Sequence, residues 1–119
     1  MAYTAQQLGS EPDRAELDQR SAPTVIEFGT GWCGYCQAAQ PLIAAAFEDY
    51  PDVEHIKIED GKGRRLGRSF RVKLWPTLIF WRDGREVDRL VRPGSSPQIT
   101  QNLARIHSNG GTETAAPEP

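Results

Sequence analysis

Residues 24–41 read TVIEFGTGWCGYCQAAQP, and this stretch decides the fold. It begins as a β-strand, because residues 24–28 are β-branched or aromatic apart from Glu27. A Gly/Thr loop follows, and then Cys33 and Cys36 open a run with apolar residues at helical spacing. The sequence therefore places a CxxC pair where a buried strand gives way to a helix.

The rest of the chain predicts further helices and strands in alternation. Helices are expected over about 12–20, with Ser10 as the N-cap, over 34–49 as one bent helix through Pro41, over 62–70, and from Ser96-Pro97 along the face of Ile99, Leu103 and Ile106. Strands are expected over 24–28, from Val53 through Ile56 to Ile58, over 77–81, and over 86–91 after a hairpin turn at Asp83-Gly84, with weak support for another near Tyr3–Ala5. A strand–helix–strand unit followed by a hairpin gives an α/β fold: a mixed central sheet with helices on both faces.

The length of 119 residues suits one domain, which we place at residues 1–107. Residues 108–119 read SNGGTETAAPEP, and this composition predicts a disordered C-terminal tail. No stretch approaches the ~20 apolar residues of a membrane helix, and the N-terminus lacks the features of a secretory signal. We therefore expect a cytoplasmic monomer that does not bind membranes.

Charge is distributed unevenly along a chain whose net charge is −2. Residues 1–60 carry 3 basic and 11 acidic side chains, whereas residues 61–119 carry 11 and 5. Six of the basic side chains fall within twelve positions: Lys62, Arg64, Arg65, Arg68, Arg71 and Lys73. The favoured interpretation is the solvated face of a short helix, balanced by acidic neighbours, and the alternative is a surface for an acidic partner. No aromatic interleaving or nucleic-acid motif accompanies the charges, so we expect no nucleic acid.

The two cysteines could hold a metal, staple the fold or perform redox chemistry. A zinc site would have to recruit His55 and His107, whose separation does not fit finger-type spacing, so we expect no metal. A CxxC disulfide closes too small a loop to add much stability, and a reducing cytoplasm would open it. Redox chemistry is the interpretation that remains.

The position of the pair supports redox chemistry. Unpaired N–H groups and the helix dipole at the start of a helix favour a thiolate over a thiol, so Cys33 is expected to be the nucleophile. Cys36 lies one turn further along on the same side of the helix. It can therefore resolve a mixed disulfide formed at Cys33 and release a reduced substrate.

These features resemble the thioredoxin family of thiol–disulfide oxidoreductases. The match rests on WCGYC at residues 32–36, on Pro41, on Trp75-Pro76-Thr77, and on the closing hairpin and helix, and it covers about residues 24–107. The resemblance implies a thioredoxin fold that reduces protein disulfides, with roles in electron transport and cell redox homeostasis. It also implies that no cofactor is bound and that a partner reductase supplies the electrons.

The resemblance also assigns roles to residues around the pair. Pro76 is expected to follow a cis peptide bond and to face the cysteines, leaving backbone groups of Trp75 free to pair with a substrate peptide; an ordinary trans proline is the alternative. Trp32, Gly34 and Tyr35 are expected to contact substrate beside Cys33. Trp32 and Trp75 either form a flat apolar surface or pack against each other to shield the site, whereas Trp81 is expected in the core.

Glu27 aligns with an aspartate that the family usually has behind the second cysteine. We expect it to act as a general base near Cys36 through water, the alternative being an outward-facing strand residue. His55 is expected to replace the lysine that the family often has near this carboxylate. Gly29 stands where a tryptophan is common in thioredoxins.

The residue pair Gly34-Tyr35 departs from the Gly-Pro of most thioredoxins, which leaves the direction of reaction open. Besides a protein-disulfide reductase, the sequence allows a disulfide oxidase or isomerase on the same fold. A third alternative is a redox-dependent binding module with little turnover, which the basic segment 62–73 favours.

Overall fold

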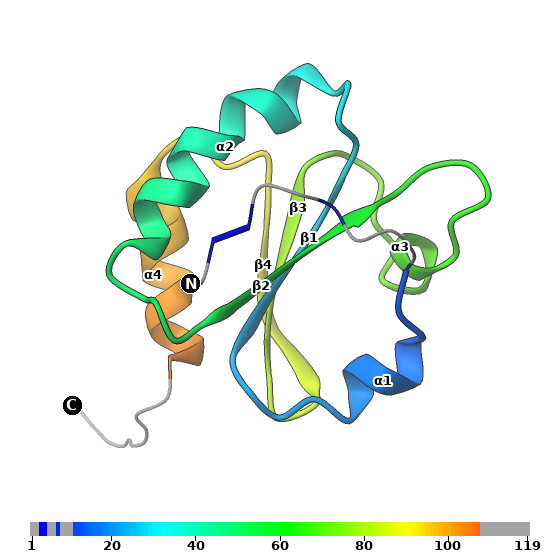
Figure 1. The fold of residues 1–119 in the computed structure, drawn as a ribbon, viewed down its shortest axis with the longest axis horizontal. Helices are drawn as coiled ribbons and strands as arrows, with labels where there is room; N and C mark the ends of the chain where they lie inside the picture. The colour runs from blue at the N-terminus through cyan, green and yellow to red at the C-terminus, as the bar shows by residue number, and fades with distance from the viewer. Residues whose placement is uncertain (1–2, 5–6, 8–10, 108–119) are drawn as a thin grey trace.

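The computed structural model describes residues 3–4, 7 and 11–107 (Figure 1). Along these residues the elements are α1 (Arg14–Asp18), β1 (Thr24–Gly29), α2 (Gly34–Phe47), β2 (Glu54–Glu59), α3 (Leu66–Ser69), β3 (Thr77–Arg82), β4 (Arg85–Val91) and α4 (Ser96–Ile106). The strands form one sheet in the order β2-β1-β3-β4, parallel between β1 and β2 and antiparallel elsewhere. The predicted α/β fold with a mixed sheet is confirmed.

Alternate residues of the central strands point into two separate cores, which is why helices cover both faces. On one face, Val25 packs with residues of α2 and α4, including Ile43 and Leu103. On the other face, Ile26 and Phe28 pack with residues of α1 and α3. Strand β1 is buried along its whole length, as expected for a central strand covered on both sides.

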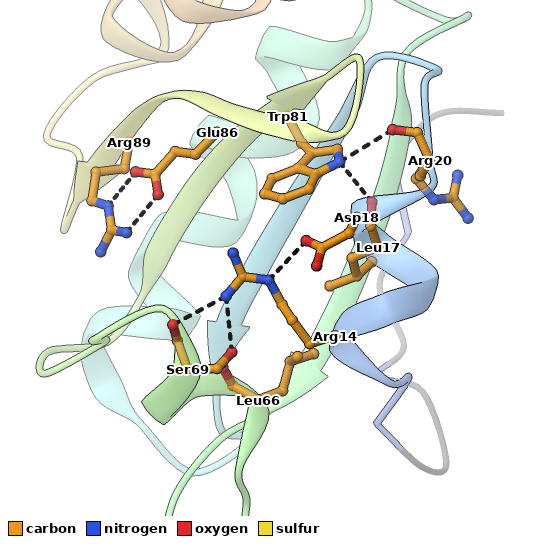
Figure 2. A network of polar contacts seen from close by, with 9 residues as sticks. All are labelled: Arg14, Leu17, Asp18, Arg20, Leu66, Ser69, Trp81, Glu86 and Arg89. Atoms are coloured by element: carbon orange, nitrogen blue, oxygen red, sulfur yellow. Dashed lines mark hydrogen bonds and ion pairs between the residues drawn. The ribbon is translucent and has the colours of Figure 1, made fainter.

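Trp81 lies in the second core, as the sequence predicted. It is 1% exposed, and its indole Nε1 donates to the backbone oxygens of Leu17 at 3.0 Å and Arg20 at 3.3 Å (Figure 2). The guanidinium of Arg14 lies 3.9 Å from the centre of the Phe70 ring and donates to Ser69. These contacts attach α1 to the sheet and to α3.

The hairpin turn follows from its sequence. Asp83 and Gly84 both adopt positive φ angles, 56° and 77°, which Asp-Gly accepts readily. A Cβ at Gly84 would lie 2.5 Å from the backbone oxygen of Asp18, so the turn also needs glycine to pack against α1.

Several predicted boundaries are wrong. Helix α1 spans five residues and is capped by Asp13 in a capping box with Glu16, whereas Ser10 lies outside the described residues. The helix at 62–70 shrinks to the four residues of α3, because Gly61 and Gly63 hold left-handed φ angles of 124° and 80° that interrupt it.

The other differences are small. Helix α2 ends at Phe47 and runs on through Pro41, so the prediction of one helix across the proline is confirmed. Strand β2 begins just after Val53. Residues 3–4 form no strand, and both Ala5 and the tail 108–119 lie outside the described residues.

Candidate active site

Cys33 is the N-cap residue of α2, at the junction that the sequence predicted. Its backbone is extended, and its sulfur accepts a hydrogen bond from the Cys36 N–H at 3.2 Å. The side chain is 7% exposed, and the two cysteines are both free in this structure. This position stabilises a negatively charged sulfur, because the sulfur faces an N–H donor and the positive end of the helix dipole.

Cys36 occupies a different environment one turn further into the helix. Its side chain is 4% exposed, and burial, reinforced by a hydrogen bond with Cys33, raises its pKa to about 12. Cys36 is therefore a thiol at neutral pH. The pair thus combines a sulfur that accepts an N–H at the start of α2 with a buried neighbour that keeps its proton.

Gly29 lies against Cys36. A Cβ at this position would sit 2.6 Å from the Cys36 sulfur. Any larger residue, including the tryptophan common in the family, would force the thiol to move. The glycine that the sequence showed as a departure therefore makes room for the second cysteine.

Glu27 is buried, and the alternative of an outward-facing glutamate is wrong. It is 2% exposed, its Oε1 lies 2.8 Å from the Nε2 of His55, and its Oε2 accepts from the Nε2 of Gln40 at 2.9 Å. The Nδ1 of His55 accepts the backbone N–H of Thr4 at 2.9 Å. Because that nitrogen accepts, the proton of a neutral His55 lies on Nε2 and is donated to Glu27.

Gln40 connects Glu27 to the surrounding side chains. Its Nε2 also donates to the backbone oxygen of Cys36 at 2.9 Å, and its Oε1 accepts from the Lys57 Nζ at 2.9 Å and the Tyr3 hydroxyl at 2.7 Å. Two donors on Oε1 fix the orientation of the amide, so Nε2 must face Glu27.

The expectation that His55 replaces the family's lysine near this carboxylate stays a prediction. His55 does contact the carboxylate, but Lys57 is also present and pairs with Glu27 in the register of β1 and β2. Lys57, Glu27 and Cys36 line one cavity of about 290 Å³. This volume is ample for water, and the lining is polar, so a water-mediated link between Glu27 and Cys36 is sterically feasible.

The tryptophans beside Cys33 pack against each other, which is one of the two alternatives that the sequence left open, and they do not form a flat surface. The rings of Trp32 and Trp75 meet edge to face, with centroids 5.6 Å apart, while Trp32 remains 75% exposed and Tyr35 60%. The Trp75 Nε1 donates to Asp60 at 2.9 Å, which fixes that ring. A Cβ at Gly34 would contact nothing, so the space beside this residue is open.

The peptide bond between Trp75 and Pro76 is cis, as predicted. The expectation that the backbone of Trp75 is free is wrong for its carbonyl oxygen, which accepts from the Arg92 Nε at 2.8 Å. The Arg92 guanidinium also lies 3.7 Å from the centre of the Tyr35 ring. A substrate that pairs with this carbonyl must either displace Arg92 or use the second lone pair of the oxygen.

Sequence reasoning missed Arg92. A regular hairpin about Asp83-Gly84 would place Val91 opposite Pro76, but an irregularity between Phe80 and Trp81 shifts the register by one residue. As a result the Arg92 N–H donates to the Pro76 oxygen at 2.9 Å.

His55 and His107 do not meet. His55 contacts Glu27, whereas the His107 Nε2 lies 3.2 Å from Asp52. Among the described residues there is no group of three or more His, Cys, Asp or Glu side chains that could hold a metal ion. Nor does the described part of the chain contain a helix long and apolar enough to cross a bilayer.

Comparison with known proteins gives consistent matches. Residues 7–105 match the family model described as Thioredoxin. The structure of thioredoxin 2 from Pseudomonas aeruginosa in its reduced form is 57% identical, covers 87% of this chain and 96% of that one, and superposes with a TM-score of 0.78. Thioredoxin H-type 1 of Nicotiana tabacum is 31% identical over 76% of this chain and 71% of the relative. Thioredoxin-2 of Saccharomyces cerevisiae is 35% identical over 67% and 76% respectively.

Proposed function

This chain belongs to the thioredoxin family and is a thiol–disulfide oxidoreductase acting through a CxxC pair, and we propose a specific role for each residue of its site. The Cys33 thiolate attacks one sulfur of a substrate disulfide, forming a mixed disulfide and releasing the other substrate sulfur as a thiolate. Cys36 then loses its proton and attacks the Cys33 sulfur. This step releases the second substrate thiolate and leaves a Cys33–Cys36 disulfide, so two electrons have passed to the substrate.

The asymmetry of the two sulfurs carries this assignment. The Cys33 sulfur accepts an N–H at the start of α2, which suits an anion, whereas the buried Cys36 keeps its proton with a pKa of about 12. A buried thiol needs a base to remove its proton before it can attack the mixed disulfide. We propose that Glu27 accepts the Cys36 proton through water in their shared cavity, while His55 and Gln40 hold the carboxylate in place.

Substrate docking is the second part of the proposal. Trp32, Gly34 and Tyr35 form the open surface next to Cys33, and Trp75 and Pro76 border it. The substrates are disulfide-containing proteins whose extended segment pairs with the backbone of Trp75, either beside Arg92 or in its place.

The cellular setting follows the family. We propose a monomer in the cytoplasm that maintains redox homeostasis without a bound cofactor and takes its electrons from a partner reductase that reopens the Cys33–Cys36 disulfide. Measuring the reduction potential of this couple against the glutathione pool decides the direction. A value well above the pool would favour the oxidase or isomerase alternative suggested by Tyr35.

Trapping separates the two cysteine roles. In Cys36→Ser, mixed disulfides with protein substrates should accumulate through Cys33 and be visible on non-reducing gels, whereas Cys33→Ser should give none. Insulin reduction with dithiothreitol should be lost in both variants. Adducts that form in Cys33→Ser instead would show that the assigned roles are reversed, and tight partner binding indifferent to both cysteines would favour the binding module.

A further inference from the structure

A second cavity, of about 430 Å³, is lined by Trp75 and by residues of the segment around α3. Basic side chains gather around it: Arg64, Arg68, Arg71 and Lys73, with Asp60 as the acidic residue of the lining. Its volume lies in the range of sites that bind small ligands or short segments. We call this feature the basic pocket.

The positive charge of the basic pocket is largely unneutralised. Sequence reasoning expected acidic neighbours to balance the segment 62–73, yet within the described residues only Arg64 has an ion pair, with Glu59 at 3.4 Å. Arg68, Arg71 and Lys73 are exposed. Asp60 adds one negative charge to the lining against the four basic side chains, and its carboxylate accepts from the Trp75 indole. The pocket therefore carries net positive charge in a chain whose net charge is −2.

The backbone holds the basic pocket in shape. The N–H of Arg71 donates to the Arg68 oxygen at 3.0 Å, and the N–H of Val72 donates to the Gly67 oxygen at 2.9 Å. These bonds tie the loop after α3 back onto that helix. A partner would therefore meet a backbone that is already ordered, which lowers the entropy lost on binding, although the exposed arginine side chains must still be ordered.

The basic pocket lies next to the reactive sulfur. Trp75 lines the pocket, and its ring contacts Trp32, the residue before Cys33. Arg92, also exposed, lies on the Trp75 carbonyl and the Tyr35 ring. A chain whose disulfide reaches Cys33 can therefore place its neighbouring residues past Trp75 and among these cations.

We propose that the basic pocket binds an acidic segment flanking the disulfide of a protein substrate. Guanidinium groups bind carboxylates through paired, charge-assisted hydrogen bonds, and clustered charge of one sign speeds the encounter with a partner of opposite charge. A nucleic acid fits less well, because the cations occupy one small pocket rather than a stripe. This inference rests on the proposed reduction of protein disulfides and adds a preference among such substrates.

The test compares two synthetic peptides that carry the same internal disulfide, one followed by a run of glutamates and the other by a run of glutamines. At low salt, kcat/KM should be about tenfold higher for the acidic peptide, and the difference should shrink as salt is added. In Arg68→Gln/Arg71→Gln the ratio of the two kcat/KM values should fall close to one.

Arg85→Gln is the matched control. Arg85 is exposed, has no ion pair among the described residues, and lies at the far end of β3 from Pro76, roughly 20 Å away. This variant should keep the full preference for the acidic peptide. Equal rates on both peptides in the wild type, or a preference that survives in the double variant, would overturn the inference. Failure to reduce either peptide would instead contradict the proposed function.

Discussion

Replacing Glu27 by glutamine tests the proton-transfer role at almost constant volume. Both partners of the carboxylate are donors: the Nε2 of His55 and the Nε2 of Gln40. Neither can reverse, because the Nδ1 of His55 accepts from Thr4 and the Oε1 of Gln40 accepts from two donors. A glutamine would therefore point its NH₂ group at a donor in either orientation, and we expect Glu27→Gln to lose about 1–3 kcal/mol of stability.

The kinetic effect should be confined to resolution. Burial raises the pKa of Cys36 to about 12, so this thiol stays protonated at pH 7 in the absence of a base. General bases contribute about 10²–10⁴ in rate, so the Cys36 step in Glu27→Gln should slow by about 10² or more. The rate of the Cys36 step in this variant should also rise close to tenfold per pH unit above pH 7. The reason is that the fraction of Cys36 present as thiolate rises tenfold per pH unit as long as the pH stays below the pKa. Attack by Cys33 should stay near the wild-type rate.

A thionitrobenzoate disulfide reports the two steps separately in one experiment. Attack by Cys33 releases the first chromophore and resolution by Cys36 releases the second, so stopped-flow absorbance gives both rates. Glu48→Gln removes an exposed carboxylate at the end of α2 and serves as the control. A second phase in Glu27→Gln that matches the wild type at pH 7 would remove Glu27 from the mechanism.

Three further outcomes are expected. Gly29→Ala should lose about 1–3 kcal/mol in urea unfolding and slow disulfide closure, since its Cβ meets the Cys36 sulfur, whereas Gly31→Ala, whose Cβ meets nothing, should match the wild type. Trp81→Phe removes an indole donor bonded to two backbone oxygens and should lose about 1–3 kcal/mol, while Trp32→Phe at an exposed site should stay within about 0.5 kcal/mol. The reduced protein should lose stability as pH rises from about 9 toward 12, because the unfolded chain releases the Cys36 proton where the folded chain retains it; urea midpoints should show this fall weakened in Cys36→Ala.

Local signals predicted the parts of the fold that position the cysteines. The β-branched run before the CxxC pair predicted β1, and Asp83-Gly84 predicted the hairpin. Both elements could be predicted because they depend on residues close together in sequence. The start of a helix at Cys33 placed its sulfur as the N-cap, and the mismatch of Glu27 with an apolar strand pointed to a buried functional carboxylate.

The parts that were missed depend on distant contacts. Arg92 reaches Trp75 only because an irregularity in the hairpin shifts the register, and nothing near Arg92 in sequence indicates this. Lys57 lies beside Glu27 because β1 and β2 pair with each other, although the whole of α2 separates the two strands in sequence. The state of charge of the segment 62–73 likewise depended on which acidic side chains from elsewhere reach it. Glu59 pairs with Arg64, whereas the Glu11 carboxylate accepts from the backbone N–H groups of Arg65 and Leu66 and forms no ion pair among the described residues.

The sulfur that caps α2 links the dithiol–disulfide equilibrium to the stability of the first turn of this helix. A thiolate at Cys33 accepts the Cys36 N–H in the first turn of α2 strongly, whereas a sulfur joined in a disulfide is a poor acceptor. Opening and closing that bond therefore changes how firmly the beginning of α2 is held, and reciprocity requires the reverse as well. A substitution that tightens this first turn only in the dithiol state should make the protein a weaker reductant, even when it leaves both cysteines in place.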